Sequence, residues 1–153
     1  MPQISEPAPD FTLPATGGEQ VTLSALRPAC VVLFFYPRDD TSGCTRESID
    51  FSELADDFKA HGVRVLGISK DSLKSHEKFA TKHDILVPLL SDEHSHACED
   101  YGVWKQKNMY GKTYMGIERT TFLIDGNGRI SRIWPRVKVP GHVRDVLEAV
   151  RAL

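Results

Sequence analysis

Residues 31–47 read VVLFFYPRDDTSGCTRE and decide the fold. The unbroken apolar run 31–36 has the length of one strand and is typical of a strand covered on both faces of a sheet. Pro37 ends this strand and fixes the direction in which the chain leaves it. Apolar residues then recur at helical spacing from about residue 45. The sequence therefore predicts that Cys44 lies where a loop becomes a helix.

A cysteine at a helix N-terminus meets unpaired backbone N–H groups and the positive end of the helix dipole, which favour the nucleophilic thiolate. The alternative is a buried structural cysteine, but residues 41–43 surround Cys44 with small polar groups. Thr41 could cap the helix and also offer its hydroxyl to the sulfur. A thiolate also needs a cationic neighbour, for which Arg46 and Arg119 are candidates.

The rest of the chain predicts a mixed-sheet α/β sandwich in one domain, residues 1–153. Parallel crossovers precede a final antiparallel pair. The expected elements are a hairpin (11–13 with 21–23), a strand (31–36), a helix (45–60), a strand (63–68), a helix (72–83), a strand interrupted by Pro88 (86–90), a short helix (92–101), a hairpin (120–124 with 129–134) and a helix (141–153). The stretch 104–117 has no clear period and is predicted to be a long loop.

Composition narrows the function. The 153 residues include 19 Lys and Arg against 21 Asp and Glu, with no basic block, so no nucleic-acid partner is expected. No apolar run has the length of a membrane span, and the N-terminus lacks the features of a signal peptide. Three cysteines are too few for a secreted disulfide framework and suit a reducing compartment. We expect a cytoplasmic protein that acts on a small molecule.

The spacing Pro37-x-x-x-Thr41-x-x-Cys44 resembles the active-site signature of peroxiredoxins. The segment 111–125, GKTYMGIERTTFLID, resembles the one that carries the active-site arginine of that family, here Arg119. From Pro9 to the last helix the chain is similar to the bacterioferritin comigratory protein branch, also called PrxQ. The resemblance implies a thioredoxin-like α/β fold with an N-terminal β-hairpin and helices on both faces of a mixed central sheet.

The resemblance also implies a reaction. The Cys44 thiolate would attack the terminal oxygen of H2O2 or an organic hydroperoxide and become a sulfenic acid. Pro37 would shield the thiolate, Thr41 would hydrogen-bond thiolate and peroxide, and Arg119 would stabilise the charge in the transition state. Glu47 would help to orient an arginine. No metal or organic cofactor is implied.

The chain departs from this family at the resolving cysteine, whose two usual positions appear here as Ile49 and Ala80. Cys30 starts the strand that Cys44 follows, roughly 20 Å away at ~3.3 Å per residue, too far for a disulfide. Cys98 follows a strand that should end at the same sheet edge as Cys44, yet it flanks an apolar stripe and is predicted to pack in the core.

We therefore expect a one-cysteine mechanism, in which an external thiol such as glutathione, glutaredoxin or thioredoxin attacks the sulfenic acid. Two alternatives stay open: Cys98 could resolve the sulfenic acid internally, or the protein could be a redox-sensing or holdase module without turnover. The pattern His94-x-His96-x-Cys98 suggests metal ligands, but in a helix these side chains diverge, so no metal site is predicted. By resemblance, we expect a monomer or weak dimer.

Overall fold

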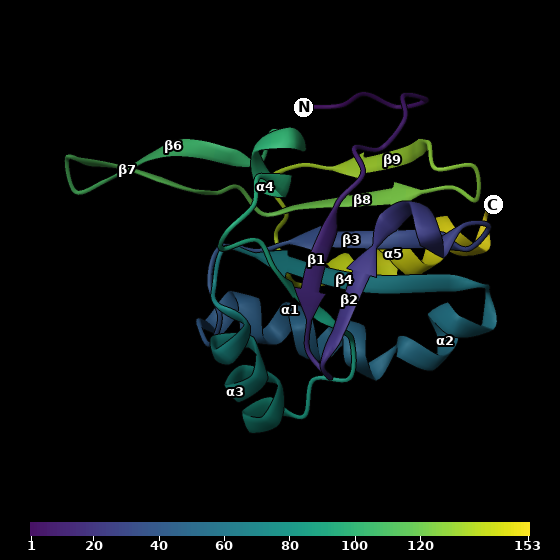
Figure 1. Cartoon of the computed structure of the whole chain (residues 1–153), viewed down its shortest axis with the longest axis horizontal. Coiled ribbons are helices and arrows are strands. Elements are labelled where there is room, and N and C mark those ends of the chain that lie inside the picture. Colours follow the sequence, from purple (N-terminus) through teal and green to yellow (C-terminus); the bar gives the residue numbers. More distant parts are fainter.

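Seven strands form one mixed sheet in the computed structural model, which describes residues 1–153 (Figure 1). They are β1 (Thr12–Ala15), β2 (Glu19–Thr22), β3 (Cys30–Phe35), β4 (Val63–Ser69), β5 (Leu89–Ser91), β8 (Thr120–Ile124) and β9 (Ile130–Trp134). Their order is β2-β1-β5-β4-β3-β8-β9, with β3, β4 and β5 parallel and the remaining pairs antiparallel. The mixed sheet and the N-terminal hairpin β1–β2 confirm the predicted fold class.

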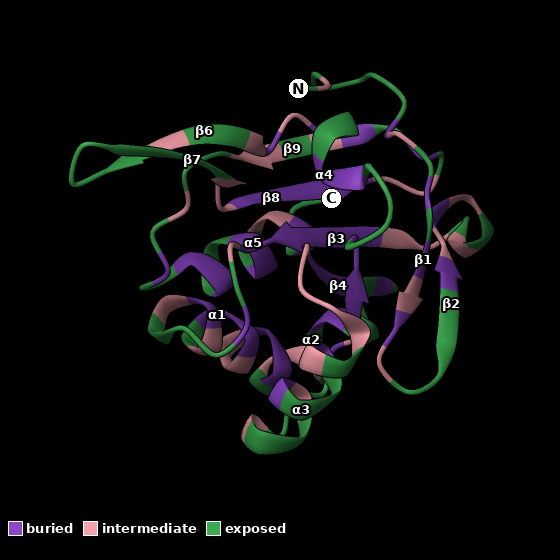
Figure 2. Cartoon of the chain, turned by 60° about the vertical axis from the view of Figure 1, so that its left-hand side comes forward, coloured by how far each residue is buried: buried purple, intermediate pink, exposed green.

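Helices cover the sheet and enclose two apolar clusters. They are α1 (Ser42–Glu53), α2 (Ala55–Ala60), α3 (Leu73–His83), α4 (Ala97–Asp100) and α5 (His142–Arg151), with a 3-10 turn at Leu23–Leu26. Successive residues of β3 point to opposite faces, so Phe34 belongs to the cluster that includes residues of α1, α2, α3 and α5, whereas Phe35 belongs to the cluster that includes residues of α4 and the N-terminal segment. Both β3 and β8 are buried between these layers (Figure 2). None of the helices has the length and apolar character needed to cross a membrane.

Three predicted elements have clearly different bounds in the structure, and the shortest of them is α4, which covers Ala97–Asp100 where a helix was predicted over 92–101. The helix predicted at 45–60 is interrupted at Leu54, which separates α1 from α2. Just before the break, Ser52 Oγ donates to Ser48 O and accepts from Leu86 N, and such back-bonding disposes a helix to bend. The strand predicted at 86–90 begins only at Leu89, because Pro88 has no N–H to donate and the Leu86 side chain is 67% exposed.

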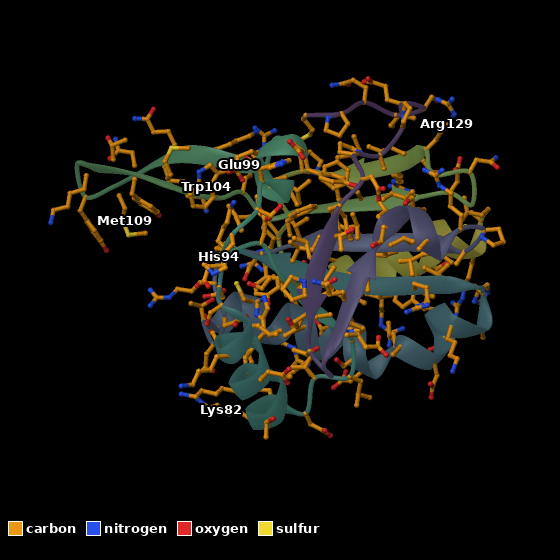
Figure 3. All side chains as sticks on the ribbon, in the orientation of Figure 1. Lys82, His94, Glu99, Trp104, Met109 and Arg129 are labelled. Atoms are coloured by element: carbon orange, nitrogen blue, oxygen red, sulfur yellow. The ribbon has the colours of Figure 1, made fainter.

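The loop prediction for 104–117 was wrong. This stretch forms a two-stranded hairpin of β6 (Trp104–Met109) and β7 (Lys112–Ile117), which projects from the body (Figures 1 and 3). Tyr110 and Gly111 connect the strands with φ values of 53° and 75°, the two positive values of a tight hairpin turn. The hairpin is mostly exposed on both faces, so its sequence lacks the alternation that marks a half-buried strand.

Candidate active site

The sheet register brings the Cys44 loop and Arg119 together. β8 runs antiparallel to β3, and Thr120 at the start of β8 pairs with Phe35 at the end of β3. Arg119 therefore lies at the edge of the sheet where the chain leaves β3 and enters α1. Residues 75 positions apart meet here because of the topology alone.

Cys44, Glu47 and Arg119 form one hydrogen-bonded group. Arg119 Nη2 donates to Cys44 Sγ at 3.3 Å, and Arg119 Nη1 donates to Glu47 Oε1 at 2.7 Å. Cys44 and Glu47 lie three residues apart on the same face of α1, so one guanidinium contacts both. A Cβ at Gly43 would lie 3.1 Å from Arg119 Nη2, so a side chain there would crowd the guanidinium. Cys44 is only 1% exposed.

Burial and charge act in opposite directions on this group. Complete burial raises the pKa of Glu47 to about 7, although the positive charge of Arg119 opposes this rise. Burial lowers the pKa of Arg119, but the carboxylate of Glu47 and the sulfur of Cys44 outweigh burial, so the net shift is upward. Arg119 stays charged, and Glu47 is the group that titrates near neutral pH.

Hydrogen bonds to Asp39 fasten the loop between β3 and α1. Asp39 accepts from Tyr36 Oη at 2.7 Å and from Ser75 Oγ at 2.8 Å, and lies 2.7 Å from His76 Nδ1. Its backbone N–H donates to Asp71 Oδ2 at 2.9 Å. Carboxylates and imidazole gathered in this way resemble a set of metal ligands. Here they tie the loop to α3.

The other predicted site residues make no hydrogen bond to the sulfur. Pro37 is half-buried and follows the end of β3 by two residues. Thr41 is exposed, and its hydroxyl donates to Arg38 O at 2.9 Å. The candidate cation Arg46 is 54% exposed and pairs with Asp50, so the cation beside Cys44 is Arg119.

The remaining cysteines lie apart from Cys44. Cys98 belongs to the apolar cluster around Phe35, on the opposite face of the sheet from the cluster that contains Cys44. Cys30 starts β3, and Cys44 follows the other end of that strand. His94 and His96 are exposed, whereas Cys98 is buried in the apolar cluster around Phe35.

Comparison with known proteins identifies the family. Residues 4–133 match the model described as the AhpC/TSA family. The chain belongs to this family. A peroxiredoxin bcp of Coxiella burnetii is 50% identical over 145 residues, covering 95% of this chain and 96% of the relative. The peroxiredoxin Bcp of Xanthomonas campestris is 45% identical over 148 residues, covering 95% and 92%.

Solved structures agree with this assignment. The bacterioferritin comigratory protein of X. campestris superposes with a TM-score of 0.88 at 44% identity, covering 93% of this chain and 90% of that chain. A cysteine-to-serine mutant of Xylella fastidiosa PrxQ superposes with a TM-score of 0.93 at 38% identity, covering 98% and 96%. The protein is therefore a thiol peroxidase of the peroxiredoxin type with a thioredoxin-like fold.

Two further residues near the site of this peroxiredoxin escaped the sequence analysis. Lys107 on β6 donates to Ile117 O, and its charge interacts with those of Arg119 and Cys44. His142 lies 3.9 Å from Glu47 through its Nε2 atom. The sequence analysis missed Lys107 because the stretch 104–117 was predicted to be a loop, and it missed His142 because no local motif includes this residue. No spacing in the sequence links either residue to Cys44.

Glu47→Gln is expected to stabilise the protein at pH 8. The folded-state pKa of Glu47, about 7, exceeds its usual 4.5, so its contribution to stability is fully present below pH 4.5 and is lost as pH rises through 7. Glutamine removes this ionisation and can still accept from Arg119. We expect urea unfolding at pH 8 to give a gain on the order of 1–3 kcal/mol that shrinks toward pH 5. An equal difference at both pH values would contradict the raised pKa.

Proposed function

We propose that this peroxiredoxin reduces H2O2 and organic hydroperoxides through a Cys44 sulfenic acid, and that an external thiol completes the cycle. The Cys44 thiolate attacks the terminal peroxide oxygen, the O–O bond breaks, and the departing oxide takes a proton to become water or alcohol. A first external thiol then displaces water from the sulfenic acid to form a mixed disulfide. A second thiol attacks this mixed disulfide, which forms an external disulfide and releases Cys44 as the reduced thiolate.

One contact carries the peroxidase half of this proposal: the 3.3 Å hydrogen bond from Arg119 Nη2 to Cys44 Sγ. It supplies a fixed positive donor where negative charge passes from sulfur to oxygen. Glu47 holds the other arm of the guanidinium at 2.7 Å and so orients it. Pro37 would shield the thiolate from water. The Thr41 hydroxyl gives its hydrogen to Arg38 O, so its lone pairs are free to accept a hydrogen bond from the peroxide.

The one-cysteine half is supported by the surroundings of Cys98. Its thiol lies across the sheet from Cys44, and burial, reinforced by the charge of Asp92, raises its pKa far above the usual range. A thiol held protonated in this way is a poor nucleophile toward a sulfenic acid. Ile49 and Ala80 occupy the other two candidate positions, so no thiol is available there.

The choice of substrate and reductant follows from chemistry. The solved X. campestris protein is described by its alkyl peroxide reduction activity, which favours organic hydroperoxides as substrates here. Three free cysteines suit a reducing compartment, where glutathione, glutaredoxin and thioredoxin are available, and we place the protein in the cytoplasm as a monomer or weak dimer. The rival proposals are internal resolution by Cys98 and a redox sensor that does not turn over.

The state of Cys44 after one equivalent of H2O2 distinguishes these proposals. We expect the intact mass to rise by one oxygen, and a sulfenic-acid trap to label the peptide that contains Cys44. Because Cys98 is dispensable in a one-cysteine cycle, Cys98→Ala is expected to keep peroxidase activity with glutathione within about threefold of the parent.

Other outcomes of the same experiment would support the rival proposals. Loss of two hydrogens together with a Cys44–Cys98 peptide would mean that Cys98 resolves, and Cys98→Ala would then lose its thioredoxin-dependent turnover. A single oxidation with no thiol-dependent cycling would favour the sensor. Cys30→Ser is the matched control, because Cys30 lies at the far end of β3.

A further inference from the structure

Glu47 has one carboxyl oxygen that the active site leaves unused. Oε1 accepts from Arg119, whereas Oε2 is buried and has no hydrogen-bond partner. Buried polar atoms without a partner are rare in folded proteins, since each costs the free energy of its lost hydration. Orientation of Arg119 alone requires only Oε1. The position of Oε2 therefore points to a second group.

The group that faces Oε2 is His142. Its Nε2 atom lies 3.9 Å from Glu47 Oε2 and 2.8 Å from Thr121 Oγ1. The ring is 5% exposed and packs edge-on against Phe51 and Trp134, with centroid distances of 6.3 and 6.0 Å. This packing fixes the ring, so Nε2 stays directed toward Glu47 and Thr121.

The charges around the pair make His142 a neutral donor. Burial lowers the pKa of His142 to about 4, reinforced by Arg119 and opposed by Asp145 of its own helix. Apart from Arg119, the charged group that acts on Glu47 is Asp50, one turn further along α1. A neutral imidazole carries one N–H. With that hydrogen on Nε2, the N–H donates to Thr121 Oγ1 at 2.8 Å and its partial positive charge lies beside Glu47 Oε2 at 3.9 Å. With it on Nδ1, Nε2 accepts from the Thr121 hydroxyl, and its lone pair repels an ionised carboxylate.

We propose that His142 is a positioning residue of the peroxidase reaction: the dipole of its Nε2–H, 3.9 Å from Oε2, stabilises the ionised Glu47 carboxylate, and the ionised carboxylate holds Arg119 against Cys44. Protonation of Glu47 weakens the ion pair with Arg119 and favours the other tautomer of the ring. The step from His142 to activity rests on the proposed peroxidase function. The step from His142 to the ionisation of Glu47 does not.

The ionisation of Glu47 can be measured without activity. In a Cys44→Ser background, the side-chain carboxyl ¹³C signal of Glu47, assigned by its loss in Glu47→Gln, is titrated by NMR. We expect a midpoint near pH 7 that rises by roughly one pH unit in His142→Phe, where the N–H dipole beside Oε2 is lost. His142→Gln keeps an N–H donor and should restore most of the midpoint. An unchanged midpoint in His142→Phe would overturn the proposal.

Activity then tests the link to Arg119. We expect His142→Phe to lower kcat/KM for H2O2 by roughly three- to tenfold at pH 6.5–7 and to recover most of the loss at pH 9, where Glu47 ionises without help. Added to Glu47→Gln, the same change should cost nothing more. A loss equal at every pH would show a merely structural role and contradict the proposal. If the parent enzyme shows no peroxidase activity, the proposed function fails while the titration still decides the role of His142.

Discussion

Cys44→Ser is expected to abolish peroxide reduction, lowering kcat/KM for H2O2 on the order of 10⁴-fold or more. A serine hydroxyl stays protonated at neutral pH, and oxygen is a far weaker nucleophile toward peroxide than a thiolate. No other thiol is placed to take over, because Cys98 is fully buried across the sheet and Cys30 lies at the far end of β3 from Arg119. The measurement is stopped-flow consumption of H2O2 with dithiothreitol as the reductant, which removes the choice of natural partner from the assay.

The folded state of this variant needs its own control. Serine is slightly smaller than cysteine and can still accept from Arg119 Nη2, so we expect thermal unfolding within a few degrees of the parent. Cys30→Ser has one thiol fewer but an intact site, and should keep its activity. If Cys44→Ser retained peroxidase activity while folded, the nucleophile would have to be another residue and the assignment of Cys44 would be wrong.

The sequence located the nucleophile and the arginine for different reasons. Cys44 could be placed from local pattern alone, because a strand, a proline and an amphipathic helix surround it. Arg119 was one of two candidate cations beside Cys44, and only the resemblance to peroxiredoxins distinguished it from Arg46, since the contact between residues 75 positions apart depends on β8 pairing with β3. Local periodicity carries no information about which strands become neighbours.

The failures have a common physical cause. Neither Lys107 nor His142 belongs to a local motif, and both reach the site through tertiary packing. The hairpin β6–β7 was missed because its side chains are exposed on both faces, which removes the apolar alternation on which strand prediction depends. Its clearest signal was the glycine at Gly111, in a turn that requires positive φ.

The structure also explains why a buried thiol and a buried acid can share one helix. Ionising the buried Glu47 carboxyl without a partner would cost free energy, and the positive charge of Arg119 offsets that cost. The same guanidinium donates to Glu47 through Nη1 and to Cys44 through Nη2. Each of the three groups therefore depends on the other two. A change in one is expected to alter reactivity well beyond the loss of a single hydrogen bond.

Arg119→Ala should show this dependence most clearly, with kcat/KM for H2O2 lowered about 10²- to 10³-fold. The variant loses the donor that faces the sulfur and leaves the Glu47 carboxylate buried without its cation. Arg119→Lys should be intermediate, because one ammonium cannot reproduce the two-armed contact with Sγ and Oε1. Rates are measured by stopped flow from pH 6 to 9, so that a change in the ionisation of Glu47 is visible as well as a change in the limiting rate.

Arg46→Ala is the matched control for Arg119→Ala. Like Arg119→Ala, this change removes one positive charge. The Arg46 side chain lies on the helix that carries Cys44, but it is 54% exposed and paired with Asp50. Solvent screens an exposed ion pair of this kind, so it contributes little to the electrostatics of the site. We therefore expect the rate of Arg46→Ala to stay within about twofold of the parent. Equal losses in Arg46→Ala and Arg119→Ala would mean that general positive charge around Cys44 controls the rate. A loss confined to Arg119→Ala would mean that the directed contact with the sulfur does.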